Sequence, residues 1–465
     1  MLLTAILIYL VVTIAIGAWS ARLVKNSNDF VLAGRSLPLF LSASALFATW
    51  FGSETIFGAS SVYLEEGLIG VIEDPFGGAL CLILFGLFYL RPMYRMNVLT
   101  IGDVFKKIFG ERLSFFASIF MIPAYFGYVA AQLIALSLVL GAVTDLSLME
   151  GVVISACIVV FYTFLGGMWA ISITDFMQTT LIVIGLLAVA YLVASEAGGI
   201  GVIIEKAPPE SFQFFPEPNF AAWISYFGAW IILGLGSIPS QDIYQRVMSS
   251  KSEKVAVQST YLAGIFYLTF GLLPLFIALG AKILYPELYL ADKQMLLPAM
   301  VLQHSNLPIQ VLFFGALISA IMSTTSSGLL APAAIISENL IRPYFGKNLK
   351  DRHFLWILRA NVVLVAGIAL LMASWKSDIY ELVAGASILM LVSLFVPLTA
   401  GLYWKKASPG GAFLALFVGT GAYLAAEMLV PNQETHLIGL FASALAMGVG
   451  SYIFPTKTLT PDELS

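Results

Sequence analysis

Long apolar stretches, most of them near 20 residues or longer, recur along almost the whole chain. A transmembrane helix needs roughly 20 mainly apolar residues, and a helix satisfies its own backbone hydrogen bonds in lipid. The chain is 60% hydrophobic and only 11% charged, which exceeds what a soluble core requires. The stretches cover residues 3–20, 37–63, 68–90, 115–143, 149–167, 174–195, 221–241, 258–281, 308–337, 355–374, 379–401, 409–430 and 436–454. The sequence therefore predicts an all-α polytopic membrane protein with 13 transmembrane helices.

Lys and Arg are distributed very unevenly between the loops on the two sides of these stretches. If the N-terminus is outside, 19 of the 23 basic residues fall in or beside inside loops. Cytoplasmic loops carry the excess of Lys and Arg in multi-pass proteins. We therefore expect an integral plasma-membrane protein with its N-terminus outside and its C-terminus in the cytoplasm.

Two of the apolar stretches are interrupted by residues that weaken a helix. Stretch 37–63 contains Gly52 among hydroxyl residues, and stretch 221–241 contains Gly236 and Pro239. Interrupted segments at matching positions of two halves mark the binding site of many transporters. Each interrupted stretch opens a group of five, so the sequence predicts a five-plus-five inverted repeat. The predicted parts are an N-terminal helix and loop at 1–36, a first repeat at 37–195, an extracellular loop at 196–220, a second repeat at 221–401, and two extra helices with a tail at 402–465.

Five consecutive hydroxyl residues, 323–327, lie in the apolar stretch 308–337. Isolated Ser and Thr in membrane helices usually bond to their own helix or help helices pack, but that explains five in a row poorly. Ala320, Ser323, Thr324 and Ser327 share one helix face. Hydroxyls on this face, with carbonyls released by a broken helix, would give a hard cation the oxygen ligands it prefers.

Other function classes have little support in the sequence. The loops are too short for a soluble catalytic module, and no nucleophile with a base or metal triad is evident, so we expect no enzyme. Two cysteines and three histidines, far apart in sequence, show no metal-ligand spacing. We expect no cofactor, no nucleic acid and no obligate protein partner, but a small-molecule solute, sodium and the lipid bilayer as partners.

Three stretches resemble the sodium/solute symporter family, which includes proline, glucose, sialic acid and choline symporters. Residues 48–52, Ala-Thr-Trp-Phe-Gly, resemble its broken first core helix, residues 162–170 with 174–178 resemble a second signature, and residues 320–324 resemble its eighth core helix. The resemblance implies a leucine-transporter-like fold and sodium as the coupling ion. It implies a main sodium site formed by the carbonyls of Ala48, Phe51 and Ala320 and the hydroxyls of Ser323 and Thr324.

Part of the family has a second sodium site, and matching residues occur here. They are Asp175, Ser323, Ser326 and Ser327. An alternative role for Asp175 is a helix N-cap, because it opens the stretch 174–195 and a carboxylate suits that end of the helix dipole.

The choline-transporter-like members are the nearer resemblance, because Trp50 stands where proline-type members carry an aspartate. Aromatic faces beside carboxylates suit a cation. The residues expected to bind substrate are Trp50, Glu54, Glu73, Asp74, Phe76, Tyr125, Tyr128, Gln132, Trp223, Phe227 and Ser240. Ser240 replaces a cage tryptophan of the choline-like relatives, which weakens the case for choline itself. Glu73 and Asp74 could instead only flank a helix N-terminus.

Asp242 and Arg246 are spaced at i and i+4, so we expect an ion pair between them. The function that we expect is sodium-coupled symport of a small cationic or zwitterionic solute, such as an amine or amino acid, by alternating access. The alternatives are a sodium-coupled sugar or carboxylate symporter, or a sensor or ion-conducting relative that does not accumulate solute.

Overall fold

The computed structural model describes all residues of the chain except 145, 347–348, 376–378, 432–433 and 456–465. The described residues form helices and connecting loops, and their only β pairing is an isolated bridge between Leu37 and Ser250. This confirms the all-α prediction. The tail expected within 402–465 falls mainly on 456–465, outside the described residues.

Over the described residues, ten helical segments are long and apolar enough to cross a membrane, or eleven if one bent pair is a single span. They are Leu2–Leu23, Glu54–Arg95, Glu111–Gly141, Leu148–Glu196, Glu253–Leu284, Leu307–Phe345, Asp351–Ala373, Leu382–Tyr403, Pro409–Leu429 and Thr435–Ile453, with Phe220–Gly236 and Gln241–Met248 as the bent pair. The count of thirteen is therefore not confirmed.

The difference in count has two local causes. The predicted stretches 149–167 and 174–195 form one helix, α9 (Leu148–Glu196), of 49 residues. This would measure about 74 Å if straight at 1.5 Å per residue, but Gly167 interrupts it with φ 49° and ψ −139°. The second cause concerns the predicted stretches 37–63 and 68–90. The first part of stretch 37–63 forms the short helix α3 (Leu39–Trp50), and the rest joins stretch 68–90 in one segment, Glu54–Arg95, within which Gly67 has φ 72°.

Both predicted helix breaks are present. After α3, Phe51 and Gly52 leave the helix, and Ser53, which is again helical, leads into a π-helical turn (Glu54–Gly58) and α4 (Ala59–Glu66). We call residues 51–53 the α3 break. α11 (Phe220–Gly236) and α12 (Gln241–Met248) meet at 48°. Pro239 and the extended backbone of Ser240 separate them, because proline cannot continue the hydrogen-bond ladder of α11.

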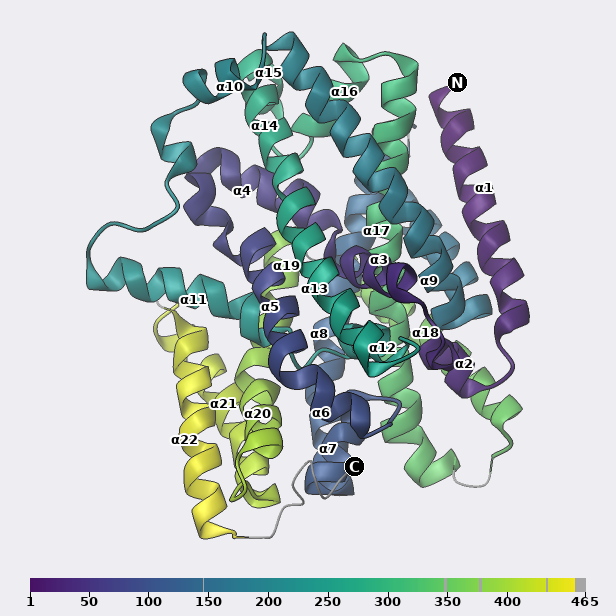
Figure 1. The fold of residues 1–465 in the computed structure, drawn as a ribbon, viewed down its shortest axis with the longest axis vertical. Helices are drawn as coiled ribbons and strands as arrows, with labels where there is room; N and C mark the ends of the chain where they lie inside the picture. The colour runs from purple at the N-terminus through teal and green to yellow at the C-terminus, as the bar shows by residue number, and fades with distance from the viewer. Residues whose placement is uncertain (145, 347–348, 376–378, 432–433, 456–465) are drawn as a thin grey trace.

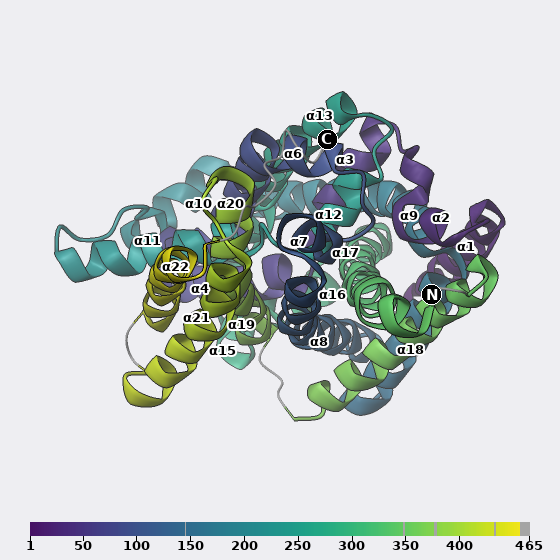
Figure 2. The ribbon, with the colours of Figure 1, turned by 90° about the horizontal axis from the view of Figure 1, so that it is seen from below.

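The helix α17 (Leu307–Ile335) carries the hydroxyl run and lies inside the bundle, packed mainly against α9 and α8 (Glu111–Gly141). Its residues from 316 to 335 are all buried. α1 (Leu2–Ser20) lies at one flank of the molecule and α21 (Pro409–Leu429) with α22 (Thr435–Ile453) at the opposite flank (Figures 1 and 2). The first and the last two helices therefore border a central group that contains the hydroxyl run.

The remaining helices connect and surround this central group. They are α2 (Ser27–Leu32), α5 (Gly78–Leu84), α6 (Leu90–Arg95), α7 (Ile101–Phe109), α10 (Ile200–Lys206), α13 (Glu253–Phe270), α14 (Leu272–Leu284), α15 (Pro286–Ala291), α16 (Leu296–His304), α18 (Asp351–Ala373), α19 (Ile379–Met390) and α20 (Val396–Tyr403). The region 196–220 contains α10 and a short turn, Pro209–Phe212, and the connection before α17 contains α15 and α16. Figure 1 shows α10, α15 and α16 together at the top of the molecule.

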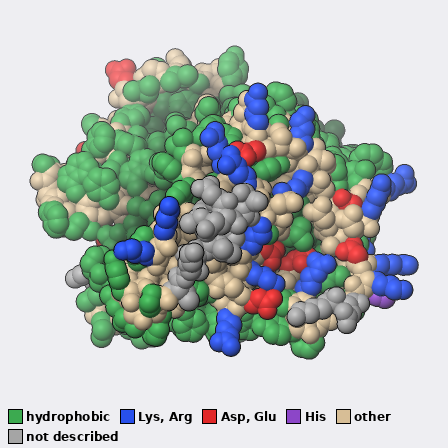
Figure 3. Space-filling model, turned by 60° about the horizontal axis from the view of Figure 1, so that its bottom comes forward, with side chains coloured by type: hydrophobic (Ala, Val, Ile, Leu, Met, Phe, Trp, Pro, Cys, Tyr) green, Lys and Arg blue, Asp and Glu red, His purple; other side chains and the backbone are tan. Residues whose placement is uncertain are grey.

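Lys and Arg side chains gather on the bottom face of the molecule (Figure 3). α6 and α7 lie toward this face in Figure 1, and these two helices carry Arg91, Arg95, Lys106 and Lys107. Charged side chains are expensive in lipid, so a face with many of them lies outside the hydrocarbon.

We predict that Gly167→Ala destabilises the protein. Gly167 has φ 49° and ψ −139°, and a non-glycine residue costs about 1–3 kcal/mol in a sparsely populated conformation of this kind. A Cβ at this position would also meet the carbonyl oxygen of Phe30 at 2.5 Å. The melting temperature in detergent should fall by several degrees. The matched control is Gly367→Ala, because Gly367 in α18 has no heavy atom within 4 Å of an added Cβ. Equal melting temperatures for the two variants would contradict the prediction.

Candidate functional site

The α3 break is held tightly between α17 and α8. A Cβ on Gly52 would lie 2.6 Å from the Thr324 hydroxyl oxygen and 2.8 Å from Oε1 of Gln132. Only glycine allows this approach of backbone to side chains. Gln132 also accepts a hydrogen bond from the backbone N–H of Ser53 at 3.1 Å. The break is therefore a fixed feature of the bundle.

Four of the five oxygens predicted for the main sodium site lie together beside this break. The Ala48 carbonyl oxygen lies 2.9 Å from the Ser323 hydroxyl and 3.3 Å from the Thr324 hydroxyl, and both hydroxyls are fully buried. The Thr324 hydroxyl lies 3.0 Å from the carbonyl oxygen of Ala320. Phe51, the fifth predicted residue, follows the last residue of α3 with ψ 80°, so its carbonyl leaves the helical direction.

The second predicted group also gathers on this side of α17. The Ser323 hydroxyl lies 2.5 Å from Oδ1 of Asp175, which is fully buried. The Ser326 and Ser327 hydroxyls each donate to the carbonyl oxygen of Ser323 at 2.8 Å. Among the described residues, Oδ2 of Asp175 has no hydrogen-bond partner. The role of Asp175 as a helix N-cap is wrong, because it lies eight residues after the interruption at Gly167, inside the helical part of α9 that follows.

The expected ion pair between Asp242 and Arg246 is not formed. Arg246 of α12 is fully buried and donates from Nη1 to the backbone oxygen of Asp242, not to its carboxylate. Its Nε donates to the carbonyl oxygen of Ala45 at 3.0 Å, and its Nη2 contacts Ser327 and lies 3.8 Å from Oδ2 of Asp175. Arg246 thus joins α12 to α3, α9 and α17.

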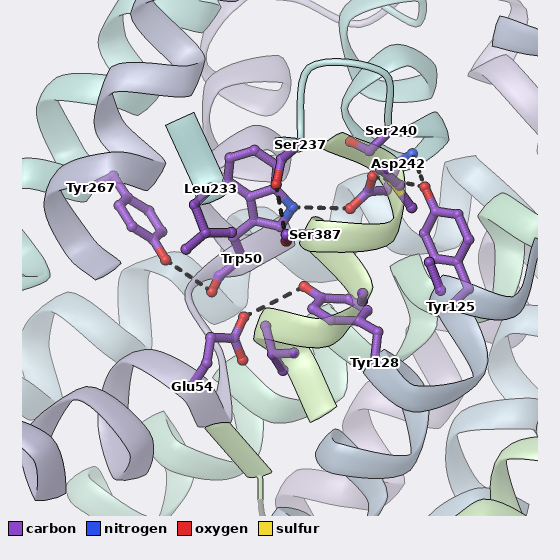
Figure 4. A pocket seen from close by; sticks show the side chains of 14 residues that line it. Trp50, Glu54, Tyr125, Tyr128, Leu233, Ser237, Ser240, Asp242, Tyr267 and Ser387 are labelled. Atoms are coloured by element: carbon purple, nitrogen blue, oxygen red, sulfur yellow. Dashed lines mark hydrogen bonds between the residues drawn. The ribbon is translucent and has the colours of Figure 1, made fainter. Parts of the chain in front are cut away.

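A cavity opens on the other side of the α3 break (Figure 4). It is lined by Trp50, Glu54, Ala124, Tyr125, Tyr128, Leu233, Ser237, Ser240, Asp242, Tyr267, Val383, Ala386, Ser387 and Met390. Two carboxylates and four aromatic rings are in this lining, but no Lys or Arg is.

Asp242, at the start of α12, is held at the cavity by neutral donors. Trp50 donates from its indole nitrogen to Oδ2 at 3.0 Å, and the Tyr125 hydroxyl donates to Oδ1 at 3.1 Å. The Tyr125 oxygen accepts hydrogen bonds from the backbone N–H groups of Gln241 and Asp242. The first turn of α12, whose amides lack partners within the helix, is thereby fixed to α8.

Glu54, the first residue after the α3 break, is also buried and held by neutral groups. Gln132 donates from Nε2 to Oε2 of Glu54 at 2.7 Å. The Tyr128 hydroxyl donates to the carbonyl oxygen of Thr49 at 2.9 Å and lies 3.5 Å from Oε1 of Glu54. Gln132 therefore positions the carboxylate without lining the cavity itself.

Besides Gln132, five of the residues expected to bind substrate do not line this cavity. Asp74 accepts hydrogen bonds from Thr55 and Tyr267 at 2.8 and 2.6 Å, a structural role beside the site. Glu73 is its buried neighbour, and Phe76 packs on Phe214 and Trp230. The rings of Trp223 and Phe227 contact each other at a tilt along α11, and Phe227 is 58% exposed. The expectation that these two complete a cage is corrected, because α11 extends away from the bundle (Figure 1).

The structure adds lining residues that sequence reasoning missed. Ser237, beside the second break, lies 3.3 Å from Ser387 of α19, and Tyr267 comes from α13. A lone serine or tyrosine in a membrane helix carries no distinguishing signal, so only the packing of distant helices reveals these residues. Asp242 was noticed, but for a different role.

The two groups of side chains share one short segment of chain. The carbonyl of Ala48 faces α17, whereas Trp50 and Glu54 line the cavity. The first group presents only oxygen atoms, which suits a hard monovalent cation. The second presents carboxylates and aromatic faces, which suit an organic cation.

Comparisons with known proteins agree with this arrangement. Residues 30–419 match the model of the sodium:solute symporter family. The chain is 30% identical over 422 residues to the high-affinity choline transporter 1 of Drosophila melanogaster, covering 86% of this chain and 67% of the relative. It is 27% identical to the sodium/proline symporter 2 of Staphylococcus saprophyticus, covering 89% of this chain and 83% of that protein.

The fold also matches solved transporters. A sodium-coupled sialic acid symporter in a substrate-bound outward-open state superposes with a TM-score of 0.86, at 17% sequence identity and 98% coverage of both chains. At this identity the likeness concerns the fold. The family match over most of the chain, with a helical membrane fold of the same kind, shows that this protein belongs to the sodium:solute symporter family.

Proposed function

We propose that this protein imports a small organic cation together with sodium by alternating access. Membership of the family supports sodium-coupled transport of a solute. The observation that carries the choice of solute is the cavity beside the α3 break, in which Glu54 and Asp242 are the only charged residues of the lining.

The main sodium ion would bind between α3 and α17. Its ligands would be the carbonyl oxygens of Ala48, Phe51 and Ala320 and the hydroxyl oxygens of Ser323 and Thr324. The present hydrogen bonds from these hydroxyls to Ala48 and Ala320 support the proposal, since they show that the oxygens lie close enough to share an ion.

A second sodium ion would bind at Asp175, with Ser323, Ser326 and Ser327. The support is Oδ2 of the fully buried Asp175, which accepts no hydrogen bond among the described residues, because a buried carboxylate oxygen is costly without one. Arg246, 3.8 Å away, would compete for the same carboxylate. Binding of this ion would therefore loosen the contact between α12 and α9.

A cation suits the cavity better than a carboxylate or a neutral sugar. Removing Glu54 and Asp242 from water costs free energy that a positive charge would offset, and an anionic solute would find no Lys or Arg in the lining. Relatives are named for choline and for proline. Ser240 lines the cavity here, so the ring that choline-like relatives place at this position is missing from the cation site.

Coupling would follow from the segment that the two sites share. Sodium on Ala48 and Phe51 would hold the end of α3 in one position, and this would fix Trp50 and Glu54 at the cavity wall. Each ligand would then favour the conformation that binds the other, which is the requirement for coupling.

We place the bottom face of Figure 3 in the cytoplasm. The gathering of Lys and Arg on that face supports this orientation by the positive-inside rule. The protein would then lie in the plasma membrane with its N-terminus outside.

We retain as proposals the thirteen spans, the inverted repeats at 37–195 and 221–401, and the helices at 1–36 and 402–465 outside that core.

Uptake by the purified full chain in liposomes tests the function. With an inward sodium gradient, one or more radiolabelled amines from a panel of amines, amino acids, sugars and carboxylates should accumulate, and potassium in place of sodium should abolish it. Accumulation that persists undiminished without sodium would overturn the proposal. Sodium flux without any solute would instead favour an ion-conducting relative.

The main sodium site can be tested with neighbouring hydroxyls of α17. Ser323→Ala and Thr324→Val should each raise the sodium concentration for half-maximal uptake by about tenfold, which is roughly 1.4 kcal/mol, because each removes an ion ligand. Thr325→Val is the matched control, since the Thr325 hydroxyl donates to the carbonyl oxygen of Ile321 in its own helix. If all three variants show the wild-type sodium dependence, the site assignment is wrong.

A further inference from the structure

We propose that the cavity selects a short-chain cation with a hydrogen-bond donor at each end. An ammonium group bearing N–H would bind Glu54, and a second donor, either a hydroxyl or another ammonium, would bind Asp242 and Ser240. This inference rests on the proposed function and narrows its substrate class to amino alcohols and diamines.

Two tyrosines of α8 each contact one of the two carboxylates. Tyr125 contacts Asp242 and Tyr128 contacts Glu54, and both tyrosines line the cavity between them (Figure 4). They are spaced at i and i+3, where Cβ atoms on a helix lie about 5–6 Å apart. Each carboxylate is therefore contacted from a different turn of α8, so a solute that reaches both needs a donor at each of its ends.

Both carboxylates retain acceptor capacity toward the cavity. A carboxylate oxygen can accept two hydrogen bonds. Oε1 of Glu54 has only the long contact of 3.5 Å with Tyr128, whereas Oε2 is bonded by Gln132. Each oxygen of Asp242 accepts one bond, from Trp50 and Tyr125. These donors are neutral, so a charged donor from the solute would add both a hydrogen bond and charge compensation.

Ser240 marks the second end of the ligand site. Its side chain lines the cavity, is 4% exposed, and among the described residues its hydroxyl has no hydrogen-bond partner. Buried hydroxyls are nearly always paired. The pair Ser237 and Ser387 lies in the same lining. A polar end of the solute at this place would give Ser240 its missing partner.

The same contacts disfavour two other cation types. A quaternary ammonium has no N–H and would leave Oε1 of Glu54 without a strong donor. A zwitterion would bring its carboxylate beside Glu54 or Asp242, with no Lys or Arg in the lining to offset the repulsion. The N–H of Ser53, a potential anchor for an anion at the broken helix, already donates to Gln132.

Binding to the purified full chain in lipid nanodiscs tests the inference by calorimetry. The probes are ethanolamine and 1,4-diaminobutane, with n-butylamine, choline and glycine for comparison, each in sodium and in potassium. At least one two-donor probe should bind in sodium about tenfold more tightly than n-butylamine, choline or glycine. If choline, n-butylamine or glycine binds as tightly, or if neither two-donor probe binds, the inference is wrong.

Variants locate the second end of the site. Asp242→Asn and Ser240→Ala should remove most of the advantage of the two-donor probe over n-butylamine, and Glu54→Gln should weaken both probes. Ser60→Ala is the matched control, because Ser60 is buried with an unpartnered hydroxyl but does not line the cavity. An unchanged advantage in both Asp242→Asn and Ser240→Ala would overturn the assignment.

Failure of the inference can be distinguished from failure of the proposed function. Sodium alone should raise the melting temperature of the wild-type protein. The same rise in each variant verifies that the variant is folded. If sodium raises the melting temperature while no two-donor probe binds, the ion site remains supported and the two-donor assignment fails. If neither sodium nor any probe has an effect, sodium coupling itself fails.

Discussion

The close approach of the α3 break to α17 is the contact on which the rest of the site depends. Gly52 leaves room for the Thr324 hydroxyl and the Gln132 amide against the backbone, where a Cβ would lie within 2.8 Å of both. This approach brings the Ala48 carbonyl to the hydroxyls of α17 and directs Trp50 and Glu54 to the opposite side. One interrupted helix thereby forms the boundary between the proposed ion site and the cavity.

The balance of buried charge explains why such a protein would bind cations. The acids Glu54, Asp74, Asp175 and Asp242 are buried around the α3 break, and Arg246 is the only buried Lys or Arg among the described residues. Neutral donors hold three of these carboxylates, but such donors supply no positive charge. Sodium and a cationic solute would supply it together, so each would reduce the cost of burying the groups that bind the other. This shared compensation is a physical basis for coupling.

The sequence predicts the helix breaks and the hydroxyl run well, because each is a local departure from an apolar helix. Ser323 and Thr324 do meet the end of α3 as expected. Contacts that depend on how helices lie against one another could not be predicted. The i and i+4 spacing favoured an Asp242–Arg246 pair, but the bend before α12 turns Asp242 toward Trp50. Likewise, Trp223 and Phe227 have suitable spacing but belong to a helix that leaves the bundle.

Hydrogen exchange of the purified full chain in sodium and in potassium tests the central claim most directly, because it does not require the solute to be known. Sodium is predicted to slow exchange in peptides covering residues 45–55 and 318–328, and potassium is not. This protection should be lost when Ser323 and Thr324 are both replaced. Identical exchange of these two segments in sodium and in potassium would contradict the account.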